Sequence, residues 1–89
     1  MLRIARIDTL NGDCLLRLEG RLIGPWVDEL RRSCAEAGAT ASRVALDLAH
    51  LSFADRDGVR LLQALGERGV ALLNCSPFVA EQLKAWVEP

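Results

Sequence analysis

The chain has 89 residues, of which 51% are apolar, and a formal net charge of −1 with both signs interspersed. This length predicts a single domain over residues 1–89, because a second hydrophobic core could not be built from so little chain. The charge balance excludes the basic footprint typical of nucleic-acid binding. No apolar run approaches the roughly 20 residues that span a bilayer, so direct membrane insertion is not expected.

The first six residues and the cysteines indicate a reducing compartment. Residues 1–6 become charged too early for the apolar core of a signal peptide, so we expect a cytoplasmic protein. Cys14, Cys34 and Cys75 are odd in number and form no C-x-x-C pair, which predicts free thiols in or near the core. With a single histidine besides, the chain has too few ligands for a zinc site, and we expect no metal or other cofactor.

The first predicted element is an antiparallel hairpin. Asn11-Gly12 separates two apolar-rich runs, residues 2–7 and 14–19, and Asn-Gly favours a two-residue type I′ turn. Gly24-Pro25 then predicts a helix start, because proline fits the first helical position. Apolar residues follow at helical spacing, and Gly38 is predicted to end this helix in the left-handed conformation. The expected buried stripe is Val27, Leu30, Cys34 and Ala37.

The second half predicts alternating strands and helices. Residues 44–48 are nearly all apolar, which indicates a short central strand covered on both faces, and Asp47 is interpreted as a polar residue at its end. Asp55 is a predicted N-cap for a helix that Gly69 ends. A last strand at 70–73 precedes Ser76-Pro77, the expected start of a C-terminal helix. The buried stripes predicted for these two helices are Val59, Leu62 and Leu65, and then Val79, Leu83 and Trp86.

These elements predict an α/β fold in the order β-β-α-β-α-β-α. The two later crossovers favour parallel pairing, with the helices packed on the sheet. We therefore expect one four-stranded mixed sheet, made of an N-terminal hairpin followed by βα units, with three main helices. One face of the sheet is expected to be partly open or covered by a short element.

Three segments resemble the STAS family. Residues 46–59, with Asp47-Leu48 before a loop and Asp55-Arg56-Asp57-Gly58 at a helix start, are similar to the family signature. Residues 69–79 resemble its last strand and the loop into its final helix, and residues 18–22 resemble the start before its first helix. The resemblance covers nearly the whole chain and implies a non-enzymatic module that binds another protein.

The family includes anti-sigma-factor antagonists, stressosome components, the cytoplasmic ends of anion transporters and small subunits of lipid-trafficking ABC transporters. In the antagonists, an anti-sigma kinase binds the loop and helix after the third strand and phosphorylates a serine there. The resemblance implies that residues 52–57 and the following helix start form the partner-binding surface. Its predicted residues are Ser52, Asp55, Arg56, Asp57 and Gly58.

The chain departs from the family pattern at its regulatory residue. The family's Asp-Ser-Ser-Gly is replaced by Asp55-Arg56-Asp57-Gly58, which puts Asp57 at the position of the phosphorylated serine. A serine kinase does not esterify an aspartate, and the carboxylate places a permanent negative charge in the first helical turn. Asp57 is either a partial mimic of the phosphorylated state or a structural first-turn acid. Ser52, the remaining hydroxyl of this loop, is an alternative phosphosite or forms a local turn hydrogen bond.

Two other functions fit parts of the sequence. The first is a small STAS subunit docked on the ATPase of an ABC-type lipid transporter, which needs no phosphorylation. The second is a metal-dependent phospho-acceptor built from Asp47, Asp55, Asp57 and His50, since hard cations prefer carboxylates. The lone lysine, Lys84, lies in the last helix, which disfavours this receiver-like reading. Trp26 is expected in the core or at an interface.

Overall fold

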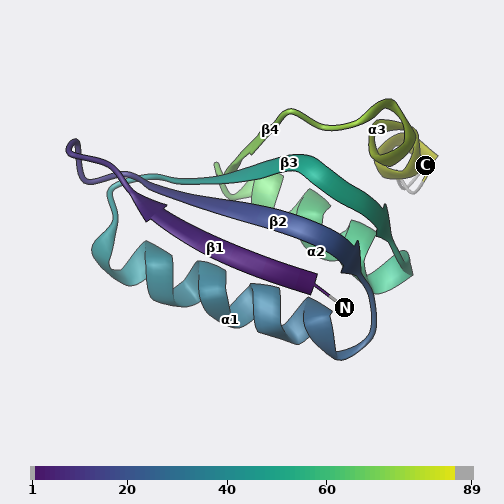
Figure 1. The fold of residues 1–89 in the computed structure, drawn as a ribbon, viewed down its shortest axis with the longest axis horizontal. Coiled ribbons are helices and arrows are strands. Elements are labelled where there is room, and N and C mark those ends of the chain that lie inside the picture. The colour runs from purple at the N-terminus through teal and green to yellow at the C-terminus, as the bar shows by residue number, and fades with distance from the viewer. Residues whose placement is uncertain (1, 86–89) are drawn as a thin grey trace.

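The computed structural model describes residues 2–85, and Figure 1 shows one sheet with α1 and α2 on the same side of it. The elements are β1 (Leu2–Asp8), β2 (Cys14–Leu22), α1 (Pro25–Thr40), β3 (Val44–Ala54), α2 (Arg56–Glu67), β4 (Ala71–Leu73) and α3 (Pro77–Ala85). The strand order is β1-β2-β3-β4, with β1 antiparallel to β2 and the later pairs parallel. The predicted α/β class, with a four-stranded mixed sheet and three helices, is confirmed.

The core lies between the sheet and the two helices. Alternate β2 side chains, Cys14, Leu16 and Leu18, are at most 1% exposed, because successive strand residues point to opposite faces. The stripes predicted for α1 and α2 are buried against them. On the opposite face, Ala5, Ile7 and Leu73 are exposed, so this face is partly open as expected. Within residues 2–85, no helix is both long and apolar enough to cross a membrane.

The β1–β2 hairpin forms, but the predicted two-residue turn is wrong. The last strand pair is Asp8 with Cys14, which leaves a five-residue loop over residues 9–13. The Thr9 N–H donates to the Asp13 carbonyl at 2.9 Å, and the Asp13 N–H donates to the Thr9 hydroxyl at 3.2 Å. Gly12 alone in this loop has positive φ, 84°, whereas a type I′ turn requires two such residues. The Thr9–Asp13 closure therefore replaces the Asn-Gly turn.

The end predicted for α1 at Gly38 is also wrong. Gly38 keeps helical geometry, and α1 continues to Thr40, where Ala41 donates its N–H to the Ala37 carbonyl at 2.8 Å. Arg6 of β1 donates a side-chain hydrogen bond to the Thr40 hydroxyl at 3.1 Å. The last turn of α1 is thus held by a contact with a distant strand, which the local sequence does not show.

The third strand is longer than predicted, and the expected loop over residues 52–57 is wrong. β3 runs to Ala54, and the Asp55 N–H extends the pairing by donating to the Leu22 carbonyl at 3.0 Å. Two irregularities interrupt its register with β2, next to Glu19 and Gly20. These shifts break the alternation of buried and exposed residues. They explain why the second half of the strand could not be recognised from a period-two pattern.

Asp47 lies within β3 and not at its end, contrary to the prediction. It is 8% exposed, and its carboxylate accepts hydrogen bonds from the Ala49 N–H at 3.0 Å, the Asn74 amide at 3.2 Å and the Arg17 guanidinium at 3.4 Å. These donors hold the pKa of Asp47 below its ordinary value, the Ala49 N–H most strongly. The carboxylate therefore links β2, β3 and the segment after β4.

The C-terminal helix begins as predicted. The Ser76 hydroxyl accepts from the Val79 N–H at 3.2 Å, and Pro77 occupies the first helical position. Val79 is fully buried, whereas Trp86 of the predicted stripe lies outside the described residues. α3 packs against β3 and α2, at the end of β3 where α2 begins (Figure 1).

Candidate protein-binding site at the start of α2

Asp55 is the N-cap of α2, as predicted, and it also holds the start of α1. One carboxylate oxygen accepts from the Gly58 N–H at 2.8 Å. The other accepts from the N–H of Gly24, the residue before α1, at 2.9 Å. A single side chain therefore fixes the starts of both helices relative to each other. The sequence predicts the first contact and misses the second, because nothing in the local pattern joins residues 24 and 55.

Gly58 has a structural role at this position. It is buried, and a β-carbon added there would lie 2.7 Å from the Leu22 carbonyl oxygen, closer than real side chains approach. The same carbonyl accepts the Asp55 N–H. The glycine thus lets α2 begin directly against the end of β2. Asp55 and Gly58 belong to the scaffold of the predicted site and not to its surface.

Arg56 and Asp57 are the exposed residues of the predicted motif. Asp57 lies in the first turn of α2, where the unpaired N–H groups of the helix stabilise a negative charge. Within residues 2–85, the Asp57 carboxylate has no hydrogen-bond or ion-pair partner. A protein that docks on this end of α2 would therefore meet an available carboxylate beside a guanidinium.

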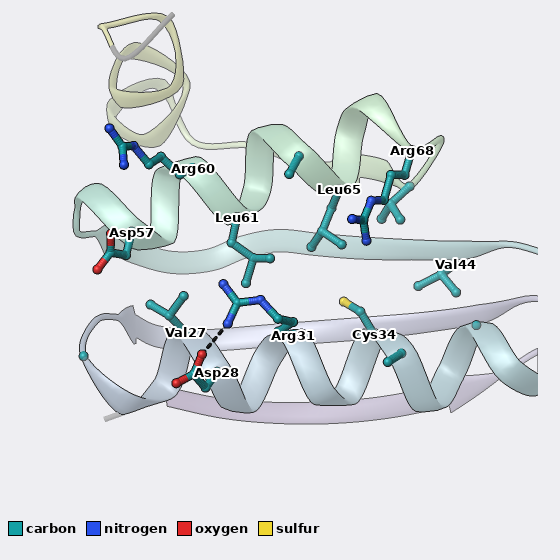
Figure 2. Close-up of a pocket in the computed structure, with 15 residues that line it drawn as sticks. Val27, Asp28, Arg31, Cys34, Val44, Asp57, Arg60, Leu61, Leu65 and Arg68 are labelled. Atoms are coloured by element: carbon teal, nitrogen blue, oxygen red, sulfur yellow. Dashed lines mark hydrogen bonds and ion pairs between the residues drawn. The ribbon is translucent and has the colours of Figure 1, made fainter.

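Asp57 also lines a groove between α1 and α2 (Figure 2). The groove has a volume of about 540 Å³, with an apolar floor that includes Val27, Leu61 and Leu65. Charged residues line its edges, and Asp28 forms an ion pair with Arg31 on the α1 side. Nothing in the local sequence connects Arg31 with Asp57. Only the packing of α1 beside α2 brings these residues to one groove.

Ser52 lies apart from this groove. It is on β3, is exposed, and donates its hydroxyl hydrogen bond to the Gly20 carbonyl at 3.0 Å. Together with Arg21 and Phe53, it lines a separate hollow. The Phe53 ring stacks on Phe78 of α3, with 6.3 Å between ring centroids. The serine is therefore engaged with the neighbouring strand, as its hydrogen-bonding interpretation predicts, though across the sheet and not within a turn.

The acidic residues considered for metal binding are dispersed. In the described part of the chain, no three His, Cys, Asp or Glu residues are grouped so that they could hold a metal ion. The Asp47 and Asp55 carboxylates are both occupied by hydrogen bonds from the protein itself. His50 is an exposed strand residue opposite Glu19 of β2.

Comparison with known proteins identifies the fold. No family model matches the chain, and no curated protein matches it. Among solved structures, the unphosphorylated anti-sigma factor antagonist SpoIIAA is similar, with a TM-score of 0.68, 23% identity, and coverage of 92% of this chain and 82% of that one.

Two further structures show the same similarity. The phosphorylated form of SpoIIAA, a cell-fate determinant from Bacillus, has a TM-score of 0.68 at 21% identity, covering 97% of this chain and 89% of that one. The STAS-domain antisigma-factor antagonist from Rhodobacter sphaeroides has a TM-score of 0.63 at 20% identity, covering 82% and 86%. The chain therefore has the fold of STAS-type anti-sigma factor antagonists.

Proposed function

We propose that this chain, which has the STAS fold, is a cytoplasmic, non-enzymatic protein-binding module of the anti-sigma-factor-antagonist type. Its partner docks on the exposed start of α2, at Arg56 and Asp57. The proposal rests on the different roles of the residues in one short motif, residues 55–58. Asp55 and Gly58 are committed to the scaffold, whereas Asp57 is exposed and has no partner within residues 2–85.

Asp57 gives this surface a constant charge. SpoIIAA has been solved in unphosphorylated and phosphorylated forms, and both resemble this chain with the same TM-score of 0.68. A phosphoserine carries about −1.5 to −2 charges at pH 7, and an aspartate supplies part of that charge permanently. We infer that the chain presents an acidic surface without a phosphorylation step, and that its partner carries a basic group opposite Asp57.

Two partner classes fit a constant acidic surface. An anti-sigma kinase fits if it tolerates or prefers the acidic form. The ATPase of an ABC-type lipid transporter fits the second candidate function, because a permanent subunit needs a surface that is never switched. The lack of a hydroxyl group at position 57 for a serine kinase to phosphorylate is the observation that favours the second class.

The first experiment measures binding and phosphoryl transfer with the anti-sigma kinase encoded in the same genome. By calorimetry, we expect the native chain to bind this kinase more tightly than Asp57→Ser, because the variant lacks the carboxylate that faces the partner's basic group. With ATP, only the Asp57→Ser chain should gain a phosphoryl group at residue 57 by intact mass and peptide mapping. Equal affinities for the native chain and Asp57→Ser would remove any switch role from position 57.

The second experiment locates the docking surface. Asp57→Lys reverses the exposed charge, and Glu67→Lys makes the same charge change at the other end of α2. We expect Asp57→Lys to weaken binding to the kinase or ATPase that binds the native chain, and Glu67→Lys to leave it unchanged. If the two variants weaken binding equally, the effect is general electrostatics and the proposed surface is wrong.

A further inference from the structure

β1 leaves one long strand edge of the sheet without a neighbour. It pairs with β2 over residues 2–8 along one side, and in the described part of the chain no strand pairs with its other side. Half of the backbone N–H and C=O groups of such an edge strand point outward and are available to another strand. β4, at the opposite edge, has three residues and offers a much shorter template.

A hollow lies beside this edge, between β1 and α1. Its volume is about 280 Å³, and its apolar side includes Leu2, Ile4 and the half-buried Trp26. Figure 1 shows β1 lying along α1. The Arg6–Thr40 hydrogen bond places the end of β1 beside the end of α1, so Trp26 lies near the start of the strand. A strand added to β1 would therefore direct alternate side chains into this hollow.

The hollow is acidic along α1. Glu29 and Glu36 both line it and are exposed. Its one cation, Arg6, is paired with Asp8 at 3.0 Å and also interacts electrostatically with Glu36. Glu29 has a longer contact, 3.7 Å, with the exposed Arg32. The α1 side of the hollow is thus suited to basic side chains.

We propose that the β1 edge and the β1–α1 hollow bind an extended segment of another protein by strand addition, with basic residues facing Glu29 and Glu36. Main-chain hydrogen bonds to β1 supply the general affinity, and alternate side chains supply the specificity. The positions along α1 of Trp26, Glu29 and Glu36 span about 15 Å, and alternate residues of a strand repeat every ~6.7 Å. The matching segment has one apolar residue, then basic residues two and four positions away.

The charges disfavour a second copy of this chain as the occupant. If the β1 edges of two copies paired antiparallel, the two α1 helices would lie side by side and run in opposite directions. Glu29 of one copy would then approach Glu36 of the other, twice per dimer, and like charges at close range are destabilising. A basic segment removes this repulsion, which is why we assign the surface to a different protein.

The probes are the peptides Thr-Val-Thr-Lys-Thr-Lys-Thr and its reversed sequence, because strand addition is possible in either direction. In ¹⁵N-resolved NMR titrations, we expect at least one peptide to shift the amides of residues 2–8 and the Trp26 indole N–H. The β1 amides should also exchange more slowly with solvent. Amides of residues 55–59, at the proposed α2 surface, should not respond, so the outcome is independent of that proposal.

A charge swap makes the test specific. The double variant Glu29→Lys with Glu36→Lys should bind the lysine peptide about fivefold more weakly, as the loss of two exposed ion pairs allows. The same variant should bind more tightly a peptide in which Glu replaces Lys. Glu67→Lys with Glu81→Lys changes the net charge equally on α2 and α3 and should have no effect.

Three results with the peptides would overturn the proposal. They are no shift with either peptide at millimolar concentration, shifts that ignore the charge swap, and shifts confined to residues outside β1 and α1. Sedimentation that shows dimerisation through β1 would also overturn it, because a second copy would then be the occupant.

Discussion

At the scale of single residues, the two glycines of α2 test different effects. Gly58 tests close packing against β2, and Gly66 tests helix propensity. Gly58→Ala places a methyl group 2.7 Å from the Leu22 carbonyl, and we expect a loss of about 1 to 2 kcal/mol in the free energy of unfolding. Gly66→Ala meets only the Leu72 side chain, at an ordinary 3.7 Å, and should gain about 0.5 to 1 kcal/mol. Urea denaturation measures both. A stabilised Gly58→Ala variant would contradict the close approach.

Asp47 makes stability depend on pH in the acid range. Its pKa is lowered in the folded state, chiefly by the Ala49 N–H and then by the Asn74 amide. A group with a lowered folded-state pKa stabilises the fold above its unfolded value, about 4, and loses this contribution as the pH falls through the folded value.

We therefore expect the urea midpoint to fall steadily below about pH 4. Asp47→Asn should be less stable at neutral pH and should show a shallower decline in acid. Asp13→Asn, in the loop between β1 and β2, makes the same substitution away from these donors and serves as the control. An unchanged slope in Asp47→Asn would assign the acid sensitivity to other carboxyl groups.

The local role of a residue in the candidate site was predictable from the sequence, whereas its contacts with distant segments were not. The capping function of Asp55 follows from its position before a helix, and the bond to Gly58 confirms it. The bond from Asp55 to Gly24 joins segments 31 residues apart, so it depends on the tertiary fold. The same holds for Arg31, which reaches the groove only because α1 packs beside α2.

At the scale of elements, the Gln82 side chain hydrogen-bonds α3 to the end of β3. Gln82 accepts from the Ala54 N–H at 3.3 Å and donates to the Ala54 carbonyl at 2.8 Å. Gln63 of α2 adds a bond to the Leu83 carbonyl at 2.7 Å. Because Ala54 is buried, losing the Gln82 amide leaves both of its backbone groups without this partner.

We expect Gln82→Leu to lower the free energy of unfolding by about 2 kcal/mol, since unpaired buried polar groups are costly. Amide hydrogen exchange should quicken first in α3 and at the end of β3, with α1 protected as before. Glu81→Leu, on the neighbouring exposed position, is the matched control. Uniform acceleration across all helices would instead indicate that α3 is not a separately attached element.

Element order and type were predictable because each relies on local chemistry. Proline and serine mark the helix starts, and apolar periodicity marks the buried faces. Element ends were less predictable, since distant contacts extend them. The Arg6–Thr40 bond accompanies the longer α1, and pairing with β2 carries β3 to Ala54.

At the scale of the whole molecule, the three thiols report different degrees of unfolding. Cys14 and Cys34 are buried in the core, on β2 and α1, and burial raises the pKa of Cys34 to about 11. Cys75 is only partly buried. The thiolate is the reactive form, so a raised pKa and burial together suppress labelling.

With excess iodoacetamide at pH 8, we expect Cys75 to react first in the native protein. Cys14 and Cys34 should react together, at a rate set by global unfolding, because both belong to the same core. Mass spectrometry of labelled peptides over time measures this, and Cys75→Ser removes the early phase. Labelling of Cys34 as fast as Cys75 would show that the α1–α2 groove opens without unfolding.

The carboxylate of Asp55 has a mechanical consequence for the two surfaces. Trp26, beside the β1 edge, is two residues beyond Gly24, whose N–H this carboxylate receives, while Asp57 is two residues beyond Asp55 itself. The first turn of α2 and the start of α1, which lies beside the other hollow, are therefore held by the same carboxylate. We expect Asp55→Ala to remove both hydrogen bonds at once and so to loosen the starts of both helices together.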